Sequence, residues 1–231
     1  MYLGPINAEW VLLIVIAIVG FIVQAKLQSV FKKYSKVMFP GGLTGKDVAE
    51  RMLHDNGIYD VKVVSTPGHL TDHYNPVNKT INLSRDVYYG NSIAAAAVAA
   101  HETGHALQHA KGYSMLKLRS TLVPAVEFAS HWVQWILLAG ILMVNSFPGL
   151  LLVGIGLFAI MTLFSFVTLP VEIDASHRAL AWLRNSGITD YQTQGYAFDA
   201  LKWAAYTYVI AALSSLATLL YYIMIYLNRR D

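Results

Sequence analysis

Residues 128–171, FASHWVQWILLAGILMVNSFPGLLLVGIGLFAIMTLFSFVTLPV, form a stretch of 44 residues that contains no Asp, Glu, Lys or Arg. One helix across about 30 Å of hydrocarbon needs only about 20 residues, so this stretch is too long for a single span. Its middle, Asn145–Gly149, is rich in residues that form turns. We therefore predict that residues 122–170 hold two transmembrane helices, at 122–144 and 149–170, joined by a tight hairpin.

A shorter apolar segment precedes this stretch, from Trp10 to Ala25, with 16 residues and no charge. Ile6 and Ala8 would lengthen it if Glu9 lies at the membrane interface. Val23–Ala25 loosely resembles the cleavage site of a signal peptide, but no Lys or Arg precedes the apolar segment. An uncleaved anchor is therefore favoured over a signal peptide. We assign residues 1–25 to a first transmembrane segment.

A fourth apolar segment, Trp203 to Asn228, has 26 residues without a charge, and we assign residues 203–231 to a fourth transmembrane helix and the C-terminus. Hydrophobic residues make up 55% of the chain and charged residues 13%, against about 25% charged in a typical soluble domain. The fold class is therefore an integral membrane protein, mainly α. No cysteine is present, which excludes disulfides and thiolate zinc sites, and no dense run of Lys and Arg indicates nucleic-acid binding.

The polar residues fall into two blocks, 26–121 and 171–202. Four spans place both blocks on the same side of the membrane. Of the 17 Lys and Arg residues, 15 lie in these blocks. By the positive-inside rule, we predict that this side is the cytoplasmic face of the plasma membrane.

Periodicity and turn residues predict short elements in the first block: a helix at 45–56, strands at 61–65 and 80–83, and a helix from 93 to about 111. Asn91 or Ser92 can cap the last helix, and Gly112 can end it.

The helix predicted from residue 93 contains His101-Glu102-Thr103-Gly104-His105. His101 and His105 are one turn apart on the same face, so both imidazoles can bind one metal ion. Glu102 beside them can reach a water held by that ion. This is the HExxH arrangement, in which two histidines bind zinc and the glutamate acts as general base on a zinc-activated water.

A catalytic zinc needs a third protein ligand and an open position. His109 is eight residues from His101, about 12 Å along a helix axis, which is too far for one ion. Glu172 is the favoured candidate, because it lies at the end of the third span and on the same predicted side as the motif. Asp174 is the alternative. An acid at such a position is costly unless it has a partner.

Two stretches, His101 to His109 and Pro170 to Ala179, resemble the YugP-like family of membrane zinc metallopeptidases. The resemblance extends to Leu70–Pro76, to Thr80–Ser84 and to the four apolar segments, and so covers nearly the whole chain.

More remotely, the chain is similar to the HtpX and CAAX-prenyl-protease group, in which a Glu within an E-x-x-A-D pattern completes the zinc site. Glu172–Ala175 matches the start of that pattern, and Ser176 replaces its Asp. Asp174 is then the candidate for the group that orients the zinc histidines.

The resemblance implies a gluzincin-type endopeptidase with one catalytic Zn²⁺ bound by His101, His105 and Glu172. Residues 26–121 would form a small zincin-like α+β catalytic part, and residues 171–202 a second catalytic segment that supplies Glu172. The implied partners are the lipid bilayer and a peptide or membrane-protein substrate. In zincins the strand before the catalytic helix lines the cleft, so Thr80–Ser84 is expected either to receive a substrate strand or to be an ordinary sheet strand.

Two other classes compete with a peptidase. A scaffold protein with a structural zinc site would require a fourth protein ligand, often Cys. It would not require Glu102. A transporter would need more ionisable groups within its spans than Glu127 and His131, which favour an interfacial position. His73, His177 and Tyr74 are further polar residues that can serve the site or the surface.

Overall fold

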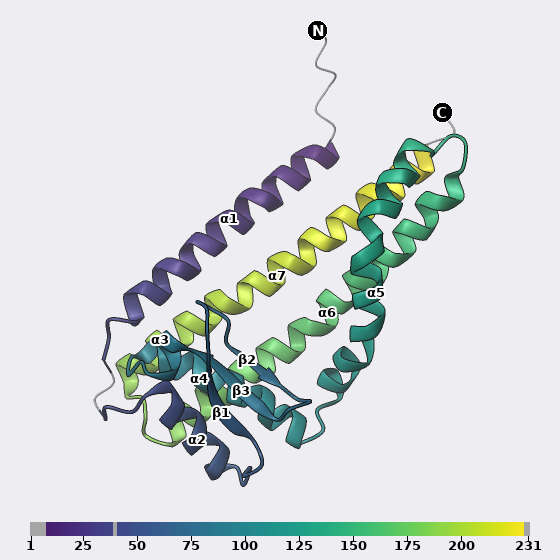
Figure 1. The fold of residues 1–231 in the computed structure, drawn as a ribbon. Helices are drawn as coiled ribbons and strands as arrows, with labels where there is room; N and C mark the ends of the chain where they lie inside the picture. The colour runs from purple at the N-terminus through teal and green to yellow at the C-terminus, as the bar shows by residue number, and fades with distance from the viewer. Residues whose placement is uncertain (1–7, 39–40, 229–231) are drawn as a thin grey trace. The chain divides into compact units, whose positions relative to one another are not determined.

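The computed structural model describes residues 8–38 and 41–228. Its elements in chain order are α1 (Ala8–Tyr34), α2 (Gly45–Asp55), β1 (Lys62–Thr66), β2 (His73–Asn75), β3 (Thr80–Ser84), α3 (Arg85–Tyr88), α4 (Ile93–Ala110), α5 (Ser114–Leu142), α6 (Pro148–Asn185) and α7 (Tyr191–Leu227) (Figure 1). The chain divides into two compact units, one of residues 1–22, 118–169 and 207–231, and one of residues 23–117 and 170–206.

Four helices are long and apolar enough to cross a membrane: Val11–Tyr34, Ser114–Leu142, Pro148–Asn185 and Tyr191–Leu227. This confirms a mainly helical chain with four candidate spans. The proposed extension of the first span to Ile6 lies outside the described residues, whereas α1 runs without a break through Val23–Ala25.

The third candidate span continues well beyond the apolar stretch that predicted it. α6 passes through Pro170 and ends only at Asn185, inside the polar block that begins at residue 171. Four residues at intervals of four in this continuation are fully buried: Val171, Ala175, Ala179 and Leu183. This buried stripe stabilises the helix where the sequence becomes polar.

In the first unit, α5 and α6 form the hairpin predicted between residues 122 and 170. Two glycines allow a close approach of the helices. A Cβ on Gly140 would lie 2.6 Å from Leu151 Cα, and a Cβ on Gly154 would lie 2.8 Å from the Leu137 side chain. Small residues at such positions allow membrane helices to pack backbone against backbone.

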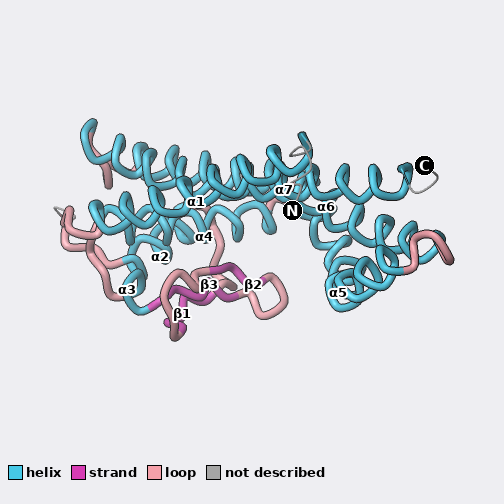
Figure 2. Tube along the Cα trace, turned by 90° about the horizontal axis from the view of Figure 1, so that it is seen from above, coloured by secondary structure: helices cyan, strands magenta, loops and turns pink. Residues whose placement is uncertain are grey.

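The second unit contains a three-stranded sheet with the order β1-β3-β2 (Figure 2). β1 pairs with β3 in parallel, and β2 pairs with β3 antiparallel along Thr80–Asn82. β3 is therefore the central strand, with both edges used over those residues. Thr80–Asn82 therefore cannot receive a substrate strand, because a strand can be added only at a free edge, and this part of the strand is an ordinary sheet strand.

Helices α2 and α4 lie over one face of this sheet (Figure 2). α2 begins with a capping box, in which the Thr44 side chain accepts from Asp47 N and the Asp47 carboxylate accepts from Thr44 N. The core between helices and sheet is fully buried, and its largest side chains are Met52, Leu53, Ile81, Leu83 and Ile93. This core holds α4, which carries the candidate site, against the sheet.

Candidate metal centre

α4 is a helix for reasons that lie in its own sequence. The Ser92 side chain accepts a hydrogen bond from Ala95 N at 3.2 Å, which caps the first turn. Six of the eight residues from Ile93 to Ala100 are alanine, the residue with the highest helix propensity. Gly112, with φ of +63°, follows the end of the helix. The histidine motif thus lies in the middle of a rigid, largely buried helix.

A glycine brings α4 and α6 into close contact at the motif. A Cβ added to Gly104 would lie 2.6 Å from the carbonyl oxygen of Ala175. Gly104 and Ala175 are both buried, so their backbones meet without side chains between them. This contact places Glu172, one turn before Ala175 on α6, opposite the two histidines of α4.

Three ligand atoms converge between these helices. Glu172 Oε2 lies 3.2 Å from His101 Nε2 and 3.5 Å from His105 Nε2. One ligand atom from each of these residues lies within 4.8 Å of the others. Two ligand atoms bound to one tetrahedral zinc at about 2.0–2.1 Å would be about 3.4 Å apart. The spacing of Glu172 from each histidine therefore fits a zinc ion, and this His₂Glu donor set would leave a fourth position open.

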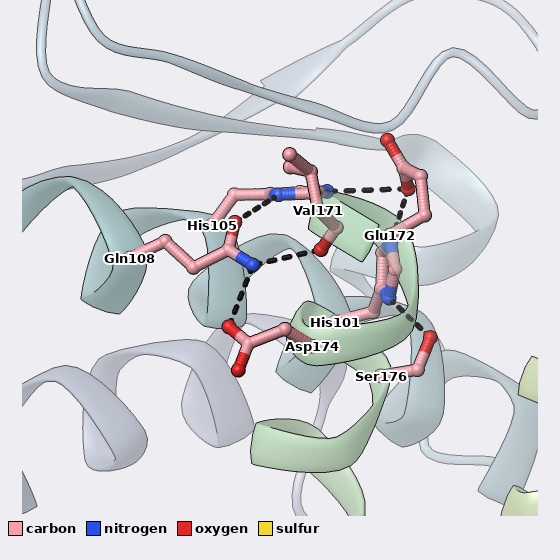
Figure 3. Close-up of polar contacts among 7 residues, drawn as sticks. All are labelled: His101, His105, Gln108, Val171, Glu172, Asp174 and Ser176. Atoms are coloured by element: carbon pink, nitrogen blue, oxygen red, sulfur yellow. Dashed lines mark hydrogen bonds and ion pairs between the residues drawn. The ribbon is translucent and has the colours of Figure 1, made fainter. Parts of the chain in front are cut away.

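Gln108 orients His105 (Figure 3). The Gln108 amide nitrogen donates to Val171 O at 2.7 Å and to Asp174 Oδ2 at 2.8 Å, which leaves its Oε1 as an acceptor 3.0 Å from His105 Nδ1. His105 must then carry a proton on Nδ1. In the neutral ring, Nε2 turns its lone pair towards the Glu172 carboxylate, and a cation between the two satisfies both.

Ser176 takes the corresponding place at the other histidine. Its hydroxyl lies 3.1 Å from His101 Nδ1 (Figure 3). The serine that replaces the Asp of the related pattern thus contacts a histidine itself. Asp174, expected to orient the histidines, reaches His105 only through Gln108, and it also accepts from Arg178 Nε at 2.6 Å.

Glu102 is buried, and it follows His101 and precedes His105, the two candidate ligands on the same helix. Burial raises the pKa of the Glu102 carboxyl, while the neighbouring His101 and His105 act to lower it. A raised pKa brings a carboxylate closer to the operating range of a general base at neutral pH.

The other candidates of the sequence analysis lie elsewhere. The candidate metal group among the described residues does not include Asp174 or His109. His109 is exposed and forms a hydrogen bond of 2.7 Å with the Tyr74 hydroxyl. His73 is exposed and bonds to Thr71 O through Nδ1.

The pair of Glu127 and His131 is not a buried acid–imidazole pair. The His131 ring bonds to the backbone carbonyl of Glu127 at 2.7 Å, and both residues are exposed.

Sequence reasoning missed Gln108, although a signal was present. Gln108 lies three residues after His105 and seven after His101, so it belongs to the same face of a predicted helix. A fully buried glutamine needs partners for its amide, which points to a structured polar site around it.

Comparisons with known proteins show the family to which the chain belongs. A family model described as "Putative neutral zinc metallopeptidase" matches residues 9–227. A protein of Bacillus subtilis (strain 168), described as "Putative membrane protease YugP", is 45% identical over 214 residues, covering 92% of this chain and 93% of that protein. No solved structure matches the chain.

The family match and the apolar helices define the class: a zinc metallopeptidase with four helices that are apolar enough to cross a membrane. Within this class, the chain belongs to the neutral zinc metallopeptidase family, and it is YugP-like.

Proposed function

We propose that this protein is a membrane-embedded zinc endopeptidase with a gluzincin-type site. One observation carries the proposal: His101, His105 and Glu172 present ligand atoms within 4.8 Å of one another, next to the buried carboxyl group of Glu102. A structural zinc site is usually closed by a fourth protein ligand and has no use for such a carboxylate.

His101 Nε2, His105 Nε2 and Glu172 Oε2 would hold the ion, with Gln108 and Ser176 keeping the two imidazoles in position. Bound zinc supplies a Lewis acid that polarises the scissile carbonyl group and makes water more acidic. The protein supplies the fixed ligand positions and a partly buried site, in which charge interactions are stronger than in water.

Zinc would be one part of the catalytic machinery, and Glu102 would be the catalytic residue that the protein supplies. Its carboxylate would accept a hydrogen bond from the attacking water and take one proton as the water adds to the carbonyl carbon. The same carboxyl group would then give this proton to the amide nitrogen as the peptide bond breaks. The products are a carboxylic acid and an amine, which ionise to a carboxylate and an ammonium group once released.

The small sheet with α2, α4 and the second half of α6 would form a zincin-like catalytic part. We assign this part to the cytoplasmic side of the plasma membrane, because 15 of the 17 Lys and Arg residues lie in the two polar blocks. Since Glu172 belongs to a helix that is also a candidate span, peptides or membrane proteins close to the bilayer are the expected substrates.

The test measures metal content and proteolysis in parallel. Wild type, Glu102→Gln, Glu172→Ala and the surface control Glu50→Gln are purified in detergent, analysed for bound metal and incubated with casein. We expect about one zinc per wild-type chain. Glu172→Ala should lose the zinc, Glu102→Gln should keep it but stop cleaving, and Glu50→Gln should behave as wild type.

Two outcomes would contradict the proposal. A wild-type protein that binds no metal would mean that the histidines serve only the fold. Retained zinc with unchanged cleavage in Glu102→Gln would mean that the site is structural and that the protein acts as a scaffold.

A further inference from the structure

A cavity of about 660 Å³ lies in the second unit, between the end of α1 and the start of α4. Its apolar lining comes from Leu27, Phe31, Leu70, Val87, Ala94 and Ala95. Pockets of 300–1,000 Å³ lined by apolar side chains are typical of sites that bind small or extended ligands. The cavity is therefore large enough for more than one side chain.

The cavity lies on the catalytic face of α4. Ala94 and Ala95 precede His101 and Glu102 by seven residues each, which is close to two full turns. Residues with this spacing share one face of a helix, about 10 Å apart along its axis. The cavity thus continues the same helical face on which the candidate metal site stands.

Ser84, the last residue of β3, also borders the cavity. Its backbone N–H and hydroxyl both donate to the Asp72 carboxylate, at 2.7 and 3.1 Å. The end of β3 therefore forms part of the cavity wall, and Asp72 holds it there.

The rim of the cavity is polar and of mixed charge. Lys32 lies on it, together with His69 and Asp86, whose side chains pair at 3.2 Å. An anionic lipid headgroup would be bound by positively charged side chains, and the negative charge of Asp86 would repel it. A polypeptide backbone, which both donates and accepts hydrogen bonds and carries no net charge, suits such a rim.

We propose that this cavity binds an apolar segment of the peptide substrate that lies next to the scissile bond. The substrate class is thus peptides and membrane-proximal protein segments with consecutive large apolar side chains beside the cleaved bond. This inference rests on the proposed function, and it adds the feature by which the site selects among substrates. The apolar walls supply affinity by removing those side chains from water.

A single introduced thiol tests the proposal without requiring cleavage, because the chain has no cysteine of its own. Gln28 is exposed and lines the cavity, whereas its neighbour Ser29 is exposed and does not. Gln28→Cys and Ser29→Cys are made in the Glu102→Gln variant, so that bound peptide stays intact. The rate of labelling by a maleimide is then measured with and without a short peptide that contains Leu-Leu-Phe.

At a peptide concentration of about ten times its Kd, occupancy should slow the labelling of Gln28→Cys about tenfold. Ser29→Cys should label at the same rate with and without the peptide, and a matched peptide with Ser-Asn-Ser should protect neither thiol. Equal labelling of Gln28→Cys with and without the Leu-Leu-Phe peptide would overturn the proposal. Protection by lipid nanodiscs in the absence of peptide would also overturn it, in favour of an acyl chain.

A kinetic variant provides the second measurement. Gln28→Trp partly fills the cavity from an exposed position, and Ser29→Trp is its control. If wild type is active, Gln28→Trp should raise KM for the Leu-Leu-Phe peptide about tenfold, which is equivalent to about 1.4 kcal/mol. The same substitution should leave KM for the Ser-Asn-Ser peptide unchanged. An unchanged KM for both peptides contradicts the inference, whereas an inactive, metal-free wild type contradicts the proposed function itself.

Discussion

Gln108 Oε1 lies 3.0 Å from His105 Nδ1, and the amide nitrogen of the same glutamine donates to Val171 O and Asp174 Oδ2. The glutamine therefore joins a candidate zinc ligand on α4 to the turn of α6 that carries Glu172. These partners determine the orientation of the Gln108 amide, since only its oxygen can accept a hydrogen bond from His105.

The Gln108→Leu substitution should weaken zinc binding about 10- to 100-fold, the usual effect of losing a partner that orients a metal ligand. Leucine has a similar volume but cannot accept from His105, and it leaves the Val171 carbonyl without this donor. The measurement is zinc affinity by competition with a chelator.

Gln108→Glu is the matched control, because it keeps an acceptor for His105 while losing the donor. We expect its zinc affinity to lie between wild type and Gln108→Leu. Wild-type affinity in Gln108→Leu would show that the glutamine does not position the ligand.

Gly104→Ala should separate α4 from α6. The added methyl group would lie 2.6 Å from Ala175 O, a backbone atom that cannot rotate away. Overpacking of this kind costs about 1–3 kcal/mol, and a shift of α6 moves Glu172 away from the histidines. We expect a lower thermal unfolding midpoint together with a loss of bound zinc.

Gly195→Ala is the control for the general effect of replacing a glycine within a helix by alanine. A Cβ at Gly195 meets no atom within 4 Å, so this substitution should stabilise α7 by up to about 1 kcal/mol and leave zinc content unchanged. The same behaviour in Gly104→Ala would contradict the close contact between α4 and α6.

Removal of metal should destabilise the protein. Zinc that binds only the folded state at about 100 times its Kd adds about 2.7 kcal/mol to the free energy of unfolding. A chelator should therefore lower the unfolding midpoint of wild type, and added zinc should restore it. Glu172→Ala should show neither change, and a midpoint of wild type that does not respond to zinc would count against a metal centre.

Asp72 should make stability depend on pH. Burial raises the pKa of its carboxyl, which outweighs the hydrogen bonds from Ser84 that act to lower it. As pH rises from about 3.9, the pKa of an unfolded Asp, the unfolded state loses its proton first. Wild type should therefore lose stability between this pH and the raised folded pKa, a loss that Asp72→Asn should lack.

The comparison of wild type with Asp72→Asn is made on metal-free protein, so that zinc release at low pH does not contribute. The unfolding midpoint of wild type minus that of Asp72→Asn should fall as pH rises from 4 to 7. A difference that stays constant would mean that the pKa of Asp72 is the same in both states.

The membrane helices could be predicted from the sequence because uncharged stretches signal them directly. The end of α6 could not be predicted in this way, because charged residues appear after Pro170 and interrupt the uncharged stretch, although the buried stripe from Val171 to Leu183 continues the helix. β2 and α3, of three and four residues, are too short to produce a periodic pattern.

For the site, the spacing of His101, Glu102 and His105 selected these residues as candidates, and the structure brings Glu172 rather than Asp174 to the two histidines. What the sequence could not provide was the arrangement across helices. Strand order decides that β3 is central, and the contact of Gly104 with Ala175 decides which α6 side chains face α4.

The order of the candidate ligands along the chain has a consequence for biosynthesis. His105 is separated from Glu172 by the whole of α5 and the first part of α6, two of the four candidate spans. A nascent chain therefore holds the two imidazoles without the carboxylate of Glu172 until α5 and the first part of α6 have been synthesised. The proposed metal centre would then form only after most of the chain exists, and a partly synthesised chain would have no hydrolytic activity.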